Sequence, residues 1–166
     1  MKFFLYTDAS FSKKHETGVA GFVIFSNEED HCSGNIASSV VKTIILKEKN
    51  NNRVELMSVI LALEYCIGEL KADAGIELYT DSRSVTDLLS RRKRLELSNY
   101  VSKNRNKVLS NADLYKKIFK LFDRILPDIH WIKGHAPKSG QDQAQKNFSY
   151  IDRLVRKKLR ELLLQD

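Results

Sequence analysis

Apolar, aromatic and β-branched positions dominate the first third of the chain and favour extended strands. The segment from Lys2 to Thr7 has this character, and Gly18 to Ser26 repeats it. The polar run Asn27–Asp30 predicts a turn, after which the chain from His31 to Lys47 is expected to return in extended form. Together these segments predict an antiparallel meander of three strands.

Helical spacing of apolar residues begins after position 50. Asparagine side chains at 50–52 can cap a helix, and the apolar positions from Arg53 to Ile67 recur every three to four residues. The remaining elements expected, in chain order, are a strand at Ile76–Thr80, a helix from near Ser82, a helix from Leu114 to Ile125 ended by Pro127, a strand at Ile129–Ile132, and a last helix with Ile151, Leu154, Val155, Leu159 and Leu162 facing inward.

This order of elements predicts an α/β fold. Strands that alternate with helices in the second half of the chain favour parallel pairing, whereas the first three strands pair antiparallel. We therefore expect a mixed five-stranded sheet flanked by helices. The length of 166 residues suits a single domain covering 1–166, and no internal repeat or low-complexity linker interrupts it.

Composition adds an expectation about partners and location. Lys and Arg total 28 against 21 Asp and Glu, a net charge of +7, which favours an anionic partner such as nucleic acid over a merely soluble basic surface. No apolar run reaches the roughly 18 residues needed to cross a bilayer. Cys32 and Cys66 have no zinc or redox spacing, so we expect free thiols, a cytoplasmic location and no membrane partner.

Four carboxylates stand where apolar or small residues would be expected. Asp8 interrupts the first strand, and Asp81 follows the strand Ile76–Thr80, each in the sequence Tyr-Thr-Asp. Glu55 lies on a helix face of small and apolar residues, and Asp152 follows a core position of the last helix. Each has a structural alternative: Asp81 could cap a helix, Glu55 could interact with a helix dipole, and Asp152 could be solvated.

Taken together, the four acids suggest one acidic cluster built from two strands and two helices. Carboxylates so close would raise one another's pKa unless divalent cations neutralised them. Oxygen ligands suit Mg²⁺ or Mn²⁺, and two such ions about 4 Å apart stabilise the attacking and leaving oxygens of phosphodiester cleavage. A basic chain with an acidic, metal-binding centre is what a nuclease requires.

The segments that carry these acids resemble the type 1 ribonuclease H family along nearly the whole chain. The matching segments, in order, are YTDAS (6–10), NNRVELMSVILALE (51–64), YTDS (79–82), NADLY (111–115), WIKGH (131–135) and IDRLV (151–155). The resemblance implies a ribonuclease H-like fold and a two-metal endoribonuclease that cuts the RNA strand of RNA–DNA hybrids. It implies 5′-phosphate and 3′-hydroxyl products and two Mg²⁺ ions, for which Mn²⁺ can substitute. We expect a monomer.

The resemblance also implies roles for individual residues. The implied metal ligands are Asp8, Glu55, Asp81 and Asp152, with Asp8 bridging both ions. His135 matches the family's mobile histidine, which is thought to assist proton transfer and product release. Asp142 lies nearer to His135 and competes with Asp152 for the fourth ligand position. Asp152 is preferred because it opens the apolar-periodic helix, as the family's aspartate does, whereas Asp142 lies in a polar loop.

Substrate contacts are expected in three places. Asn51, Asn52 and Arg53 match the turn that contacts the minor groove and RNA 2′-hydroxyls. Ser10 lies where the first loop approaches the backbone, and Ser82 and Arg83 open a helix that could accept a phosphate.

The segment around 90–107 resembles the basic protrusion that grips the DNA strand in bacterial members. Its candidate contacts are Arg91, Arg92, Lys93 and Arg94. The segment contains no tryptophan, so its grip is expected to rest on charge more than on stacking. A solvated, charged helix face is the alternative.

Two other functions stay open. A DNA-cutting nuclease of the wider superfamily would keep the fold, but the NNR and WIKGH segments resemble the hybrid-cutting group. A catalytically inactive nucleic-acid-binding module usually lacks one or more of the acids, and here all four positions have candidates.

Overall fold

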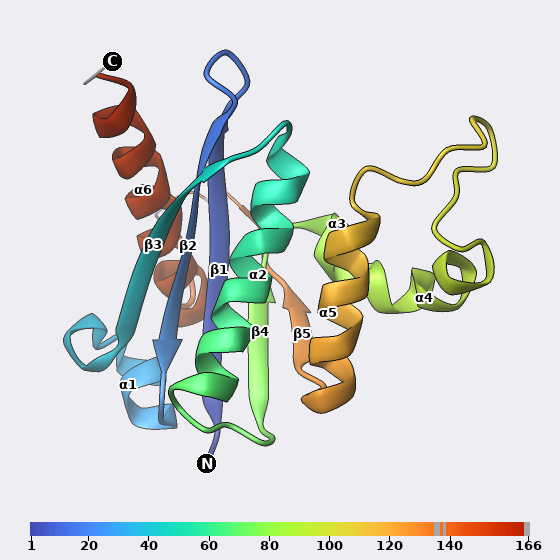
Figure 1. The fold of residues 1–166 in the computed structure, drawn as a ribbon. Helices are drawn as coiled ribbons and strands as arrows, with labels where there is room; N and C mark the ends of the chain where they lie inside the picture. Colours follow the sequence, from blue (N-terminus) through green and yellow to red (C-terminus); the bar gives the residue numbers. More distant parts are fainter. Residues whose placement is uncertain (135–136, 138, 165–166) are drawn as a thin grey trace.

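A five-stranded sheet with the order β3-β2-β1-β4-β5 forms the centre of the computed structural model, which describes residues 1–134, 137 and 139–164 (Figure 1). The strands are β1 (Phe3–Ser12), β2 (Thr17–Phe25), β3 (Val40–Lys47), β4 (Ile76–Thr80) and β5 (Asp128–Trp131). β2 pairs antiparallel with β1 and β3, whereas β4 pairs parallel with β1 and β5. The predicted mixed five-stranded α/β fold is confirmed.

Helices cover both faces of this sheet. They are α1 (Glu28–Ser33), α2 (Asn51–Gly68), α3 (Arg83–Thr86), α4 (Leu88–Leu97), α5 (Ala112–Arg124) and α6 (Gln143–Leu163), with a 3₁₀ turn at Ile36–Ser38. Figure 1 shows α2 and α5 in front of the sheet and α6 behind it. Because side chains alternate along a strand, β1 sends Phe3 and Leu5 to the α2 side and Phe4 and Tyr6 to the α6 side.

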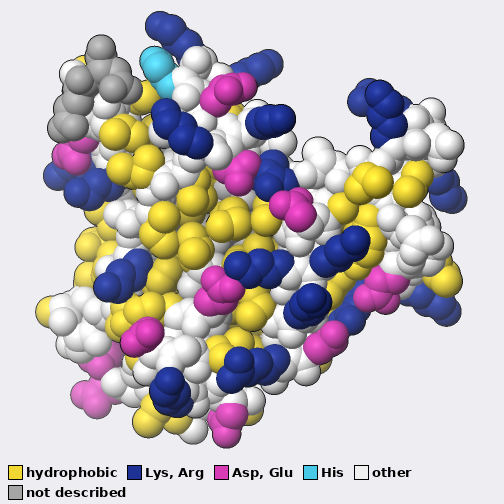
Figure 2. Space-filling model, in the orientation of Figure 1, with side chains coloured by type: hydrophobic (Ala, Val, Ile, Leu, Met, Phe, Trp, Pro, Cys, Tyr) yellow, Lys and Arg dark blue, Asp and Glu magenta, His cyan; other side chains and the backbone are white. Residues whose placement is uncertain are grey.

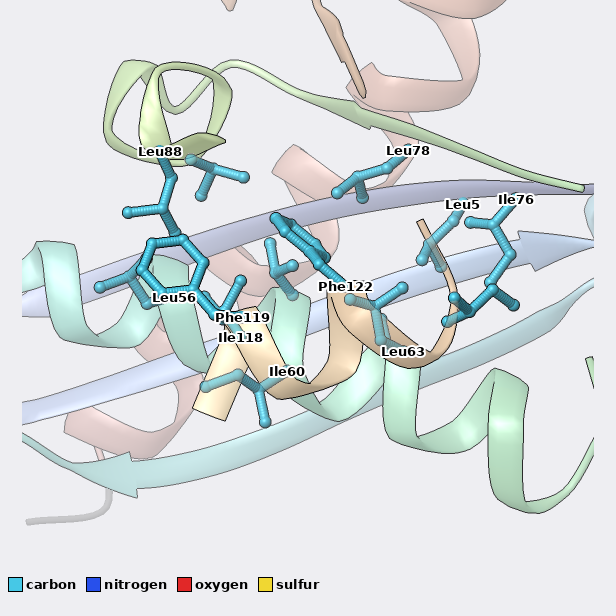
Figure 3. Close-up of a cluster of buried hydrophobic side chains, with 14 of the residues drawn as sticks. Leu5, Leu56, Ile60, Leu63, Ile76, Leu78, Leu88, Ile118, Phe119 and Phe122 are labelled. Atoms are coloured by element: carbon cyan, nitrogen blue, oxygen red, sulfur yellow. The ribbon is translucent and has the colours of Figure 1, made fainter. Parts of the chain in front are cut away.

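The core on the α2 side is the larger of the two. Figure 3 shows how it is built from strand residues that meet residues of α2 and α5: Leu5, Ile76 and Leu78 from the sheet, Leu56, Ile60 and Leu63 from α2, and Ile118, Phe119 and Phe122 from α5. Asp8 follows Tyr6 by two residues, so the two side chains share a face of the sheet. This is the face that α6 covers.

The expected turn at Asn27–Asp30 and the strand from His31 are wrong, since α1 occupies this stretch. The Asn27 side chain accepts a hydrogen bond from the Asp30 backbone N–H at 2.8 Å, and three acidic residues fill the first turn, where the helix dipole favours negative charge. Gly34 ends α1 with a left-handed φ of 68°. Only the part from Val40 to Lys47 is a strand.

The expectation that the last helix begins at Ile151 is also wrong. α6 starts at Gln143, and Asp142 is its N-cap in a capping box: the Asp142 carboxylate accepts from the Gln145 backbone N–H at 2.8 Å. The Gln145 side chain accepts from the Asp142 backbone N–H in return. Asp142 is therefore bound to the start of the helix, and Asp152 lies well inside it.

The segment that contains α4 and the chain after it projects to one side of the sheet (Figure 1). Arg92 docks it onto α5 by a bidentate pair with Asp123, at 2.5 and 2.9 Å. Figure 2 shows Lys and Arg side chains on this projecting part and hydrophobic side chains gathered in the middle of the same face. Ile44 of β3 and Leu61 and Tyr65 of α2 line a shallow hollow between β3 and α2.

Two expectations from composition concern the whole chain. Cys32 is exposed, Cys66 is buried, and both are free thiols, as expected. Among the described residues, no helix combines the length and the apolar character that a bilayer crossing requires.

Candidate active site

Asp8 is a nearly buried carboxylate in the middle of β1, with 8% of its surface exposed. Burial, the charge of Asp81, and both the charge and a hydrogen bond of Asp152 raise its pKa to about 8, against the lowering effect of the Ala9 backbone N–H. Asp8 on β1 therefore interacts with Asp81 at the end of β4 and with Asp152 in the middle of α6. The expected cluster of all four acids stays a prediction.

Asp81 lies directly after β4, against the chain that leaves β5. A Cβ atom added to Gly134 would lie 2.3 Å from Asp81 Oδ2, so any larger residue at 134 would require the Asp81 carboxylate or the backbone to shift. The Trp131 indole N–H donates to the Asp81 backbone oxygen at 3.2 Å. Neither Trp131 nor Gly134 was proposed from the sequence, although both lie in the WIKGH segment that carried the resemblance.

Glu55 is held one turn into α2 by two hydrogen bonds. Its Oε2 accepts from the Ser82 hydroxyl at 2.6 Å, and its Oε1 accepts from the Asn51 amide at 2.5 Å. Ser82 is the residue after Asp81, so Glu55 lies beside the end of β4. A second hydrogen bond joins the start of α2 to the segment after β4, because the Ser84 hydroxyl donates to Asn52 Oδ1 at 2.7 Å.

Asp152 is oriented from its own helix. Arg156 Nε lies 2.8 Å from Asp152 Oδ1 one turn further along α6, and 16% of the Asp152 side chain is exposed. Asp152, and not Asp142, is the partner that raises the pKa of Asp8. His135, the expected mobile histidine, lies outside the described residues.

The donor set fits a divalent cation. Within the described stretches of the chain, no three His, Cys, Asp or Glu side chains converge as a ready-made metal-binding group. The oxygen atoms of Asp8, Asp81 and Asp152 are nonetheless the hard ligands that Mg²⁺ prefers. The raised pKa of Asp8 shows that burial and the neighbouring carboxylates disfavour its ionised form. A cation bound there would stabilise that ionised form.

Arg53 makes its contacts inside the protein. Its Nε donates to Glu48 at 2.7 Å, and its two terminal nitrogens donate to the Asp113 carboxylate at 2.9 and 3.0 Å. A further bond runs to the Ser110 backbone oxygen at 2.6 Å. The Arg53 side chain therefore joins the start of α2 to the start of α5, beside the candidate contacts Asn51 and Asn52.

The other expected substrate residues lie in different surroundings. Ser10 is half-buried on β1, two residues beyond Asp8 and on the same face. Ser82 is buried and makes no side-chain cap to α3, since its hydroxyl binds Glu55. Arg83 is exposed, and its guanidinium carbon lies 3.9 Å from the centroid of the Trp131 ring.

The four basic candidates on α4 divide into two pairs. Arg92 binds Asp123 and Glu96 and lies over the Phe119 ring, and Arg91 lies over the Tyr115 ring, so both pack toward α5. Lys93 and Arg94 are exposed.

A hollow of about 650 Å³ lies between the β1–β2 turn, the end of β3 and the start of α2. Lys47, Lys49, Asn50 and His15 line it together with Arg53. Apart from Arg53, these lining residues were not among the candidates, although the alternating lysines at 47 and 49 are visible in the sequence. The hollow adjoins Asn51 and Asn52 in the chain.

The mixed sheet, with one carboxylate on β1, one directly after β4 and one on α6, has the architecture of the ribonuclease H-like fold. A similar solved structure is LC9-RNase H1, described as a type 1 RNase H with the type 2 active-site motif. It matches with a TM-score of 0.67 at 21% identity and covers 93% of this chain and 70% of that one. At this identity the likeness supports the fold alone.

The family model for RNase H matches residues 1–160, and the chain therefore belongs to the ribonuclease H family. The Ribonuclease H of Rippkaea orientalis is 30% identical over 157 residues, covering 93% of this chain and 83% of its own. The Ribonuclease H of Orientia tsutsugamushi is 28% identical over 142 residues, covering 86% and 77%. The expected family and enzyme class, a ribonuclease H hydrolase, are confirmed. Membership implies endonucleolytic cleavage of RNA in RNA–DNA hybrids.

Proposed function

We propose that this chain hydrolyses the RNA strand of RNA–DNA hybrids by a two-metal mechanism, with Mg²⁺ as the ion and Mn²⁺ as a substitute, and leaves 5′-phosphate and 3′-hydroxyl ends. The observation that carries the proposal is the interaction of the nearly buried Asp8 with both Asp81 and Asp152. Carboxylates paired in this way repel one another, and the arrangement is useful only where cations or protons compensate the charge.

The proposed ligands are Asp8, Glu55, Asp81 and Asp152. Two divalent ions bound there would supply charge stabilisation to the attacking and leaving oxygens of the phosphodiester. Arg156 orients the Asp152 carboxylate, and Ser82 orients one oxygen of Glu55. Asp8 must give up its proton before it can bind a cation, so burial makes its ligand form dependent on pH. His135 is the proposed proton carrier for product release.

The proposed substrate contacts combine groove and phosphate recognition. Asn51 and Asn52 lie beside Glu55, where their amides can reach RNA 2′-hydroxyls in a minor groove. Ser10, Ser82 and Arg83 would lie near the scissile phosphate. Lys93 and Arg94 would bind phosphates of the DNA strand, with Arg91 and Arg92 holding α4 in place.

The test is cleavage of an end-labelled RNA–DNA hybrid with Mg²⁺ or Mn²⁺, and with EDTA. Single-stranded RNA, duplex RNA and duplex DNA serve as competing substrates. Cutting of only the RNA strand of the hybrid, lost with EDTA, supports the proposal. Cutting of DNA would replace the substrate, and binding of the hybrid without any cleavage would favour an inactive binding module.

Asp152→Asn and Asp142→Asn form a matched pair that tests the site itself. Asp152→Asn should abolish cleavage and leave hybrid binding in place. Asp142→Asn should leave cleavage by the folded protein unchanged, because Asn is also an accepted helix N-cap. Activity that depends on Asp142 and not on Asp152 would overturn the ligand assignment. A monomeric state and a cytoplasmic location stay predictions, the first testable by sedimentation.

A further inference from the structure

Trp131, the only tryptophan of the chain, makes two contacts that meet on one three-residue turn. Its indole N–H donates to the Asp81 backbone oxygen at 3.2 Å, and the Arg83 guanidinium carbon lies 3.9 Å from its ring centroid. Ser82, between them, donates to Glu55 at 2.6 Å. The turn at 81–83 is therefore held from the β5 side by Trp131 and from the α2 side by Glu55.

We propose that Trp131 is a positioning residue for this turn: it fixes Asp81 through the indole N–H and presents the Arg83 guanidinium to a phosphate of the nucleic acid. The inference rests on the proposed function for the identity of the substrate. Trp131 itself would touch neither the reacting atoms nor a bound cation.

The contact between Arg83 and Trp131 leaves Arg83 ready to bind an anion. Stacking uses the flat face of a guanidinium, whereas its N–H donors point outward in the plane. Among the described residues, the Arg83 side chain makes no hydrogen bond, and it is exposed. An arginine held in one orientation before binding loses less conformational freedom on binding, and its fork matches two phosphate oxygens.

The position of Trp131 is set by the sheet. Trp131 pairs with Thr80 in the parallel β4–β5 ladder, and the Ile132 backbone N–H donates to the Thr80 oxygen at 2.9 Å. Trp131 is 44% exposed. A large aromatic side chain that is half exposed on an edge strand contributes little to the core. Its contacts with the Asp81 backbone oxygen and with the Arg83 guanidinium therefore explain a tryptophan at this position better than burial does.

Steady-state kinetics separate the two contacts. Trp131→Phe keeps a ring face but has no N–H, so kcat should fall severalfold with little change in KM. Trp131→Leu removes both contacts and should raise KM about tenfold, as should Arg83→Leu, since each removes one oriented charge-assisted contact. Arg83→Leu/Trp131→Leu should raise KM no further than either single change. Two KM effects that multiply would overturn the proposal.

The fluorescence of Trp131 gives a readout that does not depend on cleavage. Arg83→Leu should shift the emission of the free protein, whereas Arg124→Leu, the same charge change at an exposed position of α5, should not. In EDTA, binding of an RNA–DNA hybrid should change the emission of the wild-type protein but not of Arg83→Leu. Identical emission of Arg83→Leu and wild type would contradict the stacking, even if the chain proved unable to cut hybrids. Trp131→Phe serves in the kinetics if Trp131→Leu does not fold.

Discussion

Arg53 and Asp113 form a bidentate ion pair between residues that are 60 positions apart in the sequence, with N–O distances of 2.9 and 3.0 Å. The pair links the first turn of α2 to the first turn of α5, and Glu48 and the Ser110 carbonyl complete the set of partners. The hydrogen bonds to Asp113, and to a smaller extent Glu48, raise the pKa of the Arg53 guanidinium, so Arg53 stays charged at every ordinary pH. The ion pair thereby fixes the first turn of α2, which carries Asn51 and Asn52, against the start of α5.

Arg53→Leu should lower the free energy of unfolding by about 2 kcal/mol, because charge-assisted hydrogen bonds are lost and two carboxylates lose their partner. Urea unfolding followed by circular dichroism measures this. Asp113→Asn should cost less, since Glu48 and Ser110 still bind Arg53. The double variant should cost less than the sum of the two. An unchanged urea midpoint in Arg53→Leu would show that the pair does not contribute.

The stability of the metal-free protein should depend on the protonation of Asp8. Its pKa of about 8 in the folded protein exceeds the ordinary value of 3.8, so the folded state keeps this proton where the unfolded chain has lost it. The free energy of unfolding should therefore fall as the pH rises from about 4 to about 8. Asp8→Asn removes the titration, and its stability relative to wild type should rise through the same window.

Thermal melting in EDTA at half-unit pH steps measures this difference. With Mg²⁺ in excess, the wild-type curve should become flatter at the alkaline end, because a cation compensates the ionised carboxylates. A constant difference between Asp8→Asn and wild type from pH 4 to 8 would show that Asp8 has an ordinary pKa.

Gly134→Ala should remove most cleavage activity while the protein stays folded. The added Cβ would lie 2.3 Å from Asp81 Oδ2, so the carboxylate or the backbone must move. A displacement of about 1 Å at a reacting centre can cost on the order of a hundredfold in rate. The measurement is kcat for a hybrid, together with the melting temperature.

Gly68→Ala is the matched control for that change. Nothing lies within 4 Å of a Cβ at Gly68, the last residue of α2. It should keep full activity and gain up to about 1 kcal/mol of stability, since alanine favours a helix over glycine. Equal activity in both alanine variants would mean that the close approach of Gly134 to Asp81 has no functional effect.

Arg94→Gln and Arg92→Gln should affect hybrid binding in different ways. Arg94 is exposed, and loss of one phosphate contact should lower the slope of log Kd against log salt by about 0.9. Arg92 binds Asp123, so its replacement should loosen the docking of α4 on α5 and lower stability. Binding titrations from 50 to 200 mM salt, paired with urea unfolding, compare the two. A reduced salt slope for Arg92→Gln with unchanged stability would reverse these roles.

The sequence predicts the elements well where hydrophobic periodicity is strong. β4 has the predicted bounds Ile76–Thr80, and Pro127 follows the end of α5 as expected. α1 was missed because it buries none of its residues, so it leaves no apolar period to detect. The start of α6 was missed although Asp142 and Gln145 have the spacing of a capping box.

The acids of the candidate site are visible in the sequence because each is unusual in its local surroundings. The partners of the arginines are not visible in this way. Arg53 and Arg92 look like surface cations until the fold brings Asp113 and Asp123 to them across 60 and 31 positions. The sequence shows which residues are charged. Only the packing of α2 and α4 against α5 determines whether such a side chain forms an ion pair within the protein or stays available to bind a ligand.

The parallel pairing of β1 with β4 also has a consequence for when activity can arise during synthesis. The interacting aspartates come from β1, the end of β4 and α6, so no short stretch of the chain contains them together. Contacts between distant segments form late because loop closure costs entropy before it gains energy. A half-made chain on the ribosome therefore lacks Asp152 next to Asp8 until α6 has emerged and packed against the sheet. The topology itself delays the onset of nuclease chemistry until folding is complete.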